Sequence, residues 1–148
     1  MSDSVETVLA FWREQREQLR QSENQRSQLT NYILVLTVAI SGLIVQQKFT
    51  PRTLPLALLL IGIGMYGALS SAKYHERAEY HLTQARALTQ TLTALGALGD
   101  QAPLQQRRQD HYAKYPRLHR IRLYWLWTGL HLAITGYGIV LTLIVLIR

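Results

Sequence analysis

The sequence contains no cysteine, which excludes disulfide bonds and any metal or redox site built on thiolates. Lys, Arg, Asp and Glu are all missing from three long apolar runs, residues 32–46, 54–72 and 123–147. A positively charged segment is also missing at Met1, where about 30 mostly polar residues precede the first run. We therefore expect no cleavable signal peptide, and the first apolar run should itself direct membrane insertion.

The three apolar runs predict membrane-spanning helices. A bilayer core about 30 Å thick needs roughly 20 helical residues to cross it. The second and third runs meet this length, whereas the first must extend over neighbouring Asn31 and Gln47. We predict an all-α membrane protein, a single multi-pass membrane domain over residues 1–148, with spans at 31–47, 54–72 and 123–147.

The basic residues are distributed unevenly between the segments that separate the spans. Residues 1–30 hold four Lys or Arg and residues 73–122 hold nine, whereas residues 48–53 hold two and the tail holds only Arg148. Because cytoplasmic loops carry the excess of Lys and Arg, this predicts a cytoplasmic N-terminus and an external C-terminus in a bacterial inner membrane. The net charge of +7 is then a topology signal, and we expect no nucleic-acid partner.

Two of the spans should continue into long cytoplasmic helices. Residues 4–30 contain neither Gly nor Pro, so this helix should run directly into the first span. The segment 50–55 contains two prolines and predicts a short external turn. The second span should continue as a cytoplasmic helix over residues 73–98. The first two spans would then form a long antiparallel hairpin that extends into the cytoplasm.

A heptad seam supports pairing of the two cytoplasmic helices. Apolar and small residues recur at alternating spacings of four and three at Tyr74, Ala78, His81, Ala85, Leu88, Leu92 and Leu95. Antiparallel pairing with helix 4–30 would set Trp12 near Leu92. The same pairing would bring Glu23 and Arg26 close to Arg77 and Glu76, which predicts interfacial ion pairs at the membrane surface.

The two histidines of this region, His75 and His81, raise the alternative of a metal site. Zinc sites on helices place two histidines at i and i+4 so that both imidazoles share a face. His75 and His81 are six residues apart and point in different directions around a helix. We therefore predict an interfacial polar belt without a metal ion.

Residues 99–122 form a basic linker, which we expect to be helical and interrupted by Pro116. Its cations are Arg107, Arg108, Lys114, Arg117, Arg120 and Arg122. Clusters of this kind beside a span attract anionic lipid headgroups. A pocket for a small anionic ligand remains an alternative. An RNA-cleaving pair of Arg107 and His111 lacks any partner motif that would position a substrate.

His131 is the one titratable side chain within an apolar span, and intramembrane ionisable groups are functional candidates by default. It could hydrogen-bond a neighbouring helix or line a polar path. We expect it to face a subunit interface or a lumen. Small residues predict close helix packing at Gly64 and Ala68 in the second span and at Gly129 and Ala133 in the third.

The helical hairpin over residues 5–98, with Glu23, Arg26, Glu76 and Arg77 at its polar ends, resembles the SLATT class of small bacterial membrane effectors. These effectors occur beside nucleotide-signalling defence genes. The plan is also similar to small octameric membrane proteins of the RipA type. The third span departs from a plain two-span plan. The resemblance implies oligomeric assembly and triggered membrane permeabilisation.

Two functions follow from these features as hypotheses. The first is an oligomeric bacterial inner-membrane protein that forms a pore or perturbs the membrane and is gated through its cytoplasmic helices. The alternative is a membrane-anchored helical scaffold that docks a cytoplasmic partner protein. No nucleophile and base are arranged as in an enzyme, so we predict no catalytic residues and no cofactor. The expected partners are the lipid bilayer, anionic lipids and further copies of the chain.

Overall fold

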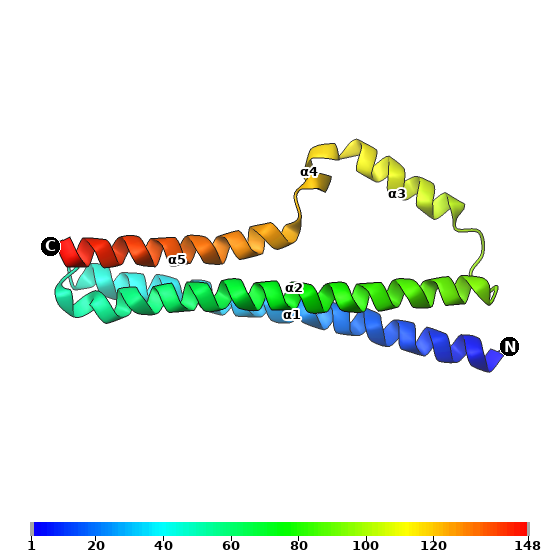
Figure 1. Cartoon of the computed structure of the whole chain (residues 1–148), viewed down its shortest axis with the longest axis horizontal. Coiled ribbons are helices and arrows are strands. Elements are labelled where there is room, and N and C mark those ends of the chain that lie inside the picture. Colours follow the sequence, from blue (N-terminus) through cyan, green and yellow to red (C-terminus); the bar gives the residue numbers. More distant parts are fainter. Residues whose placement is uncertain (1, 148) are drawn as a thin grey trace. The chain divides into compact units, whose positions relative to one another are not determined.

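The computed structural model describes residues 2–147, and every regular element in that range is a helix. In chain order the elements are α1 (Ser2–Gln46), the 3-10 helix η1 (Pro51–Thr53), α2 (Leu54–Ala94), α3 (Ala102–Lys114), α4 (Pro116–Arg120) and α5 (Leu123–Ile147) (Figure 1). Among them α1, α2 and α5 are long and apolar enough to cross a membrane. The prediction of an all-α chain with three candidate spans is confirmed.

Helices α1 and α2 are unusually long because nothing in their sequences interrupts them. They run for 45 and 41 residues respectively. The turn between them begins after Gln46, and Pro51 opens η1. Helix α2 ends at Ala94, short of the predicted end at residue 98. Gly96 takes a left-handed conformation (φ 70°), and the Ala97 N–H then bonds the carbonyl of Leu92 at 3.0 Å, which closes the helix.

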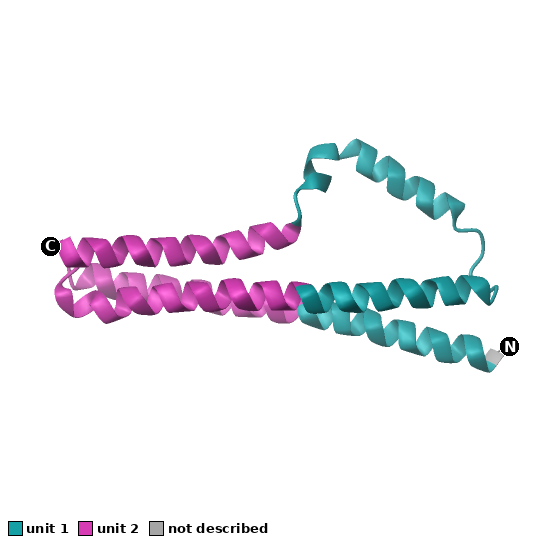
Figure 2. Ribbon diagram, in the orientation of Figure 1, with its two compact units in different colours: residues 1–22, 76–122 teal, residues 23–75, 123–148 magenta. Residues whose placement is uncertain are grey.

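The chain divides into two compact units (Figure 2). Unit 1 comprises residues 1–22 and 76–122, and unit 2 comprises residues 23–75 and 123–148. Helices α1 and α2 contribute to both units, whereas α3 and α4 belong to unit 1 and α5 belongs to unit 2.

Unit 2 is a three-helix arrangement with an apolar core. The core consists of Ile40 and Ile44 from α1, Ala57 and Leu60 from α2, and Leu141 from α5. Ile44, Ala57 and Leu60 are completely buried. The two core residues of α1 are four apart and those of α2 are three apart, so each of these helices turns one narrow apolar stripe toward the core.

Unit 1 pairs the first half of α1 with the second half of α2 through polar contacts. The Trp12 Nε1–H donates to Thr89 Oγ1 at 3.0 Å, and His81 Nδ1 lies 2.7 Å from Gln15 Oε1. In these contacts the residue numbers of α2 decrease as those of α1 increase, so the two segments pair in an antiparallel manner. The sequence predicted Trp12 near Leu92, which is one turn further along α2 than Thr89.

The predicted seam on α2 lies in this pairing. Ala78, Ala85 and Leu92 are buried, at 7%, 3% and 4% exposure. The remaining seam positions are half-buried, and none is exposed. Small residues at Ala78 and Ala85 leave room for the polar side chains of α1 to reach across.

Candidate functional site

A set of polar side chains is buried in unit 2 where α1, α2 and α5 pack together. We refer to it as the polar layer, and its members are Arg26, Thr30, Ser71, Trp127, Thr128 and His131. All of them except Trp127 are at most 9% exposed. The indole nitrogen of Trp127 is itself buried. Burying so many polar groups is unfavourable unless each finds a partner, so this layer needs an explanation.

His131 lies at the centre of the polar layer. It is fully buried, and its Nε2 lies 3.2 Å from Thr30 Oγ1. The Thr30 hydroxyl already donates its one hydrogen to the carbonyl of Arg26 at 2.9 Å. Thr30 can therefore only accept from His131, which assigns a proton to Nε2 and leaves Nδ1 as a bare acceptor in the neutral ring.

The expectation that His131 faces a subunit interface or a lumen is wrong, because the side chain is enclosed within one chain. Gly67 of α2 is the reason. A Cβ at Gly67 would meet His131 Nδ1 and would lie 2.8 Å from both Cγ and Cε1 of the ring. Only glycine leaves room for the imidazole between the two helices.

Two further glycines bring α2 and α5 close together. A Cβ at Gly64 would lie 2.6 Å from the backbone nitrogen of Thr135, and one at Gly138 would lie 2.8 Å from that of Ile61. In these pairs the residue numbers of α2 decrease as those of α5 increase, so the two helices are antiparallel. The backbone of α2 is thus held against α5 over the two turns of α5 that follow His131.

The predicted packing residues divide between two environments. Gly64 and Ala68 are buried in unit 2. Gly129 and Ala133 are exposed, and no atom lies within 4 Å of a Cβ placed at Gly129. Sequence reasoning counted Gly67 among the small residues of the second span but did not pair it with His131. The signal that could have set it apart is its spacing of three from Gly64 and four from Ser71, which puts all of them on one face of α2.

Arg26 brings a cation into the polar layer. It is only 6% exposed, and its Cζ lies 5.3 Å from the centroid of the Trp127 ring, a cation–π contact. Burial lowers the pKa of Arg26, and the charge of Glu23 opposes that change. Arg77, in unit 1, donates from Nη2 to Gln18 Oε1 at 3.3 Å. The interfacial ion pairs expected from the sequence stay predictions.

Several buried atoms of the polar layer have no hydrogen-bond partner. They are Arg26 Nε, Ser71 Oγ, Trp127 Nε1, Thr128 Oγ1 and His131 Nδ1. Leaving one such group unsatisfied costs about 1 to 3 kcal/mol, and folded proteins leave few of them. Their concentration on the three facing helices of one unit marks the polar layer as the candidate functional site.

The basic linker of the sequence forms α3 and α4, neither of which contains a buried residue. The helices are separated at Tyr115, because Pro116 cannot continue α3. Rings and cations organise the segment locally. Arg108 Nε donates to the Tyr112 hydroxyl at 3.3 Å, and the Tyr112 ring stacks on His119 with centroids 4.0 Å apart. The predicted contact of these cations with anionic lipids stays a prediction.

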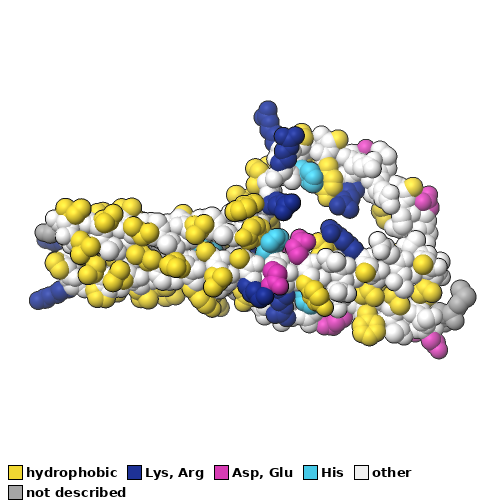
Figure 3. All heavy atoms as spheres, viewed as in Figure 1, with side chains coloured by type: hydrophobic (Ala, Val, Ile, Leu, Met, Phe, Trp, Pro, Cys, Tyr) yellow, Lys and Arg dark blue, Asp and Glu magenta, His cyan; other side chains and the backbone are white. Residues whose placement is uncertain are grey.

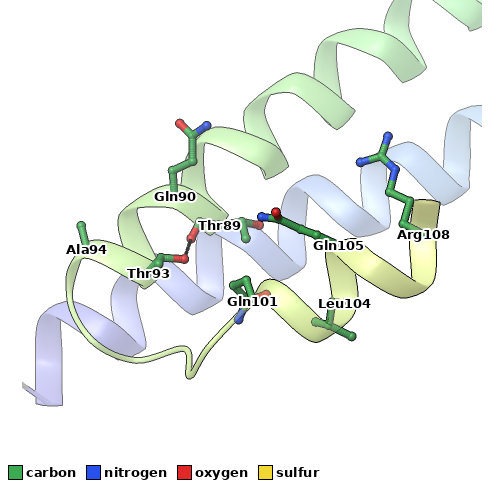
Figure 4. Close-up of a pocket in the computed structure, with 8 residues that line it drawn as sticks. All are labelled: Thr89, Gln90, Thr93, Ala94, Gln101, Leu104, Gln105 and Arg108. Carbon is green, nitrogen blue, oxygen red and sulfur yellow. Dashed lines mark hydrogen bonds between the residues drawn. The ribbon is translucent and has the colours of Figure 1, made fainter. Parts of the chain in front are cut away.

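A groove of about 620 Å³ lies between the end of α2 and the start of α3 (Figure 4). Its lining residues are Thr89, Gln90, Thr93, Ala94, Gln101, Leu104, Gln105 and Arg108. In Figure 4 Gln105 extends toward Thr89, whereas Gln90 points away. Most of these side chains are exposed, and the Nε of Arg108 already donates to Tyr112. The groove is therefore a weaker candidate site than the polar layer.

The two histidines considered for a metal site make other contacts. The ring of His75 stacks on Tyr124 with centroids 4.5 Å apart, and His81 contacts Gln15. Within residues 2–147, no group of three or more His, Cys, Asp or Glu is arranged to hold a metal ion.

Comparison with known proteins finds no matching family model, no similar curated protein and no similar solved structure. The resemblance to SLATT and RipA-type proteins stays a prediction.

Proposed function

We propose that the chain is an oligomeric protein of a bacterial inner membrane that permeabilises the membrane when its cytoplasmic helices respond to a signal. In this proposal α1 and α2 form a long hairpin whose ends extend into the cytoplasm, and α5 returns to the outer side. The observation that carries the proposal is the buried polar layer beside an apolar core, within helices that expose apolar surface. No catalytic step is assigned to the chain.

The outer surface of the helices supports a membrane location. In the most apolar window of each candidate span, only 22%, 33% and 28% of the residues are buried. Figure 3 shows apolar side chains covering the helices of unit 2, with most charged side chains over unit 1. An apolar surface of this extent is stable in lipid and would associate or aggregate in water.

The charge distribution supports the proposed orientation. Arg and Lys are concentrated in the segments that belong to unit 1, and Tyr124, Trp125 and Trp127 stand at the start of α5. Aromatic rings of this kind favour the headgroup level, and basic segments favour the cytoplasmic side. A reporter that is active only in the cytoplasm should be inactive when fused after Arg148, and an active fusion would contradict the topology.

In this proposal the interior of unit 2 acts as a closed gate. The polar layer lies toward the start of α5, and the apolar core containing Ile44, Leu60 and Leu141 fills the other end. Water and ions cannot pass such a core while it is packed. Helices α1 and α2 contribute residues to both units, so the chain itself connects the cytoplasmic segments to this core.

A substitution in the sealing core tests the gate. Leu60 is fully buried, whereas its neighbour Leu59 is 49% exposed on the same helix. We expect Leu60→Ser to depolarise cells on over-expression more strongly than wild type, as read with a potential-sensitive dye. Leu59→Ser has the same amino-acid composition as Leu60→Ser, and it should depolarise cells no more than wild type does. If wild type, Leu60→Ser and Leu59→Ser all left the membrane potential unchanged, that result would contradict permeabilisation.

The proposal includes assembly into an oligomer, because three spans bury little of their own surface. The exposed small residues Gly129 and Ala133 allow a helix of another copy to approach α5 closely. Mass measurement in detergent should show several copies of the chain. A strictly monomeric particle would contradict the oligomeric part of the proposal.

The alternative function is a membrane-anchored scaffold for a cytoplasmic protein, and one observation favours it. Helices α3 and α4 contain no buried residue, and Leu104 (60%) and Leu118 (67%) are exposed on them. A scaffold should leave the membrane potential unchanged in every variant described above. Loss of a co-purifying cytoplasmic protein on Leu118→Asp, without any depolarisation in wild type or Leu60→Ser, would favour the scaffold.

A further inference from the structure

The unpaired atoms of the polar layer are unequal in what they can bind. Arg26 Nε and Trp127 Nε1 can only donate a hydrogen bond, and the hydroxyl groups of Ser71 and Thr128 can donate or accept. His131 Nδ1 is the one obligate acceptor among them, and it becomes a donor if the ring is protonated. Four of the five groups can therefore donate to a single acceptor-rich species.

The charge of the polar layer also favours an acceptor-rich partner. Arg26 is buried at 6% exposure and is the cation of the layer. Burial lowers its pKa because the charged form is poorly solvated there, with Glu23 acting in the opposite sense. A buried cation with a free N–H gains most from an anionic partner, since charge-assisted hydrogen bonds are about twice as strong as neutral ones.

The helix register also places the residues that carry these donors on neighbouring turns of the three helices. Arg26 lies against Trp127, and Thr128 is the next residue of α5. His131 lies one turn further along α5 from Trp127 and contacts Gly67 of α2. Ser71 is one turn from Gly67 on the same face of α2, so the antiparallel pairing brings it level with Thr128.

We propose that the polar layer is a binding site for a small anion, which enters when α2 and α5 move apart. The inference rests on the proposed function and deepens it, because it identifies anions as the class of species that the permeabilised membrane passes. The unpaired atoms are closed to solvent in the described conformation, so an occupant requires that movement. Arg26 Nε, Trp127 Nε1 and the two hydroxyl groups donate to the anion.

Iodide is a suitable probe because it quenches tryptophan fluorescence on contact. The double variant Trp12→Phe and Trp125→Phe leaves Trp127 as the single tryptophan, since the sequence has three. In detergent we expect iodide to quench the fluorescence of Trp127 in a saturable manner, and we expect chloride to displace the iodide. Caesium, a cationic quencher, should have little effect. Linear quenching by iodide, equal quenching by both ions, or none would overturn the proposal.

Two arginine variants on α1 provide a matched test. Arg26→Gln should weaken the iodide affinity by about tenfold or more, the loss expected for one charge-assisted hydrogen bond. Arg20→Gln removes the same charge from an exposed position and should leave the affinity unchanged. Circular dichroism establishes whether both variants fold. If Arg26→Gln does not fold, Arg26→Lys is the second variant. An affinity that is insensitive to Arg26 would overturn the proposal.

Ion flux into lipid vesicles separates the inference from the function on which it rests. With the purified full chain, we expect chloride to cross faster than potassium. Flux of both ions at equal rates would contradict the anion site and leave permeabilisation intact. Saturable iodide quenching without any flux would contradict permeabilisation and leave the anion site intact.

Discussion

Gly67→Ala is the sharpest test of the packing that encloses His131. The added methyl group would meet Nδ1 of the ring and lie 2.8 Å from two of its carbon atoms. The imidazole is fully buried and bonded to Thr30, so it cannot turn aside without breaking that contact. Forcing extra volume into a packed core costs about 1 to 3 kcal/mol, and the lost hydrogen bond adds about 1 kcal/mol.

We therefore expect Gly67→Ala to lower the free energy of unfolding by about 2 to 4 kcal/mol. The measurement is equilibrium unfolding in mixed micelles of a mild and a denaturing detergent, followed by far-ultraviolet circular dichroism. Gly62→Ala is the matched control on the same helix, because no atom lies within 4 Å of a Cβ at that position. It should be neutral or slightly stabilising, since alanine is the better helix former.

A double-mutant cycle with His131→Ala identifies the cause. If the methyl group acts through the imidazole, Gly67→Ala should cost much less once the ring is removed, with a coupling of about 1 to 3 kcal/mol. The reasoning would be refuted if Gly67→Ala were no more destabilising than Gly62→Ala, or if the two substitutions added without coupling.

Three further outcomes follow from single contacts. Thr30→Val removes the acceptor of the His131 Nε2–H and should destabilise by about 1 to 3 kcal/mol in the same assay, whereas Thr30→Ser should retain most of the stability. Trp12→Phe removes the bond to Thr89 and should cost about 0.5 to 1.5 kcal/mol, with faster amide exchange confined to unit 1. Gly96→Ala should cost about 1 to 2 kcal/mol because of its positive φ, and Gly99→Ala should not.

Much of the fold could be predicted from local features of the sequence. Charge-free apolar runs of sufficient length select helices, because a backbone in lipid must satisfy its own hydrogen bonds. The absence of Gly and Pro before residue 42 accounts for the length of α1. The stop at Ala94 was less predictable, since Gly96, Gly99 and Pro103 all compete to end the helix and only the left-handed conformation of Gly96 decides among them.

The candidate site shows the limit of such reasoning. His131 stood out in the sequence because it is titratable and lies in an apolar run, but periodicity could not say which helix it contacts. Arg26 was assigned to an interfacial ion pair, and its position against Trp127 depends on the parallel alignment of α1 and α5. That alignment is set by long-range packing, which a local pattern does not encode.

By itself the sequence determined the all-α class of the chain, its three apolar helices and the seam on α2, because these depend on composition and on periods of three and four residues. Only the tertiary structure decided that the polar residues of three separate helices lie together. The physical reason is steric: Gly64, Gly67 and Gly138 lack the Cβ atoms that would keep α2 and α5 apart. That close approach encloses His131 and leaves its Nδ1 without a partner.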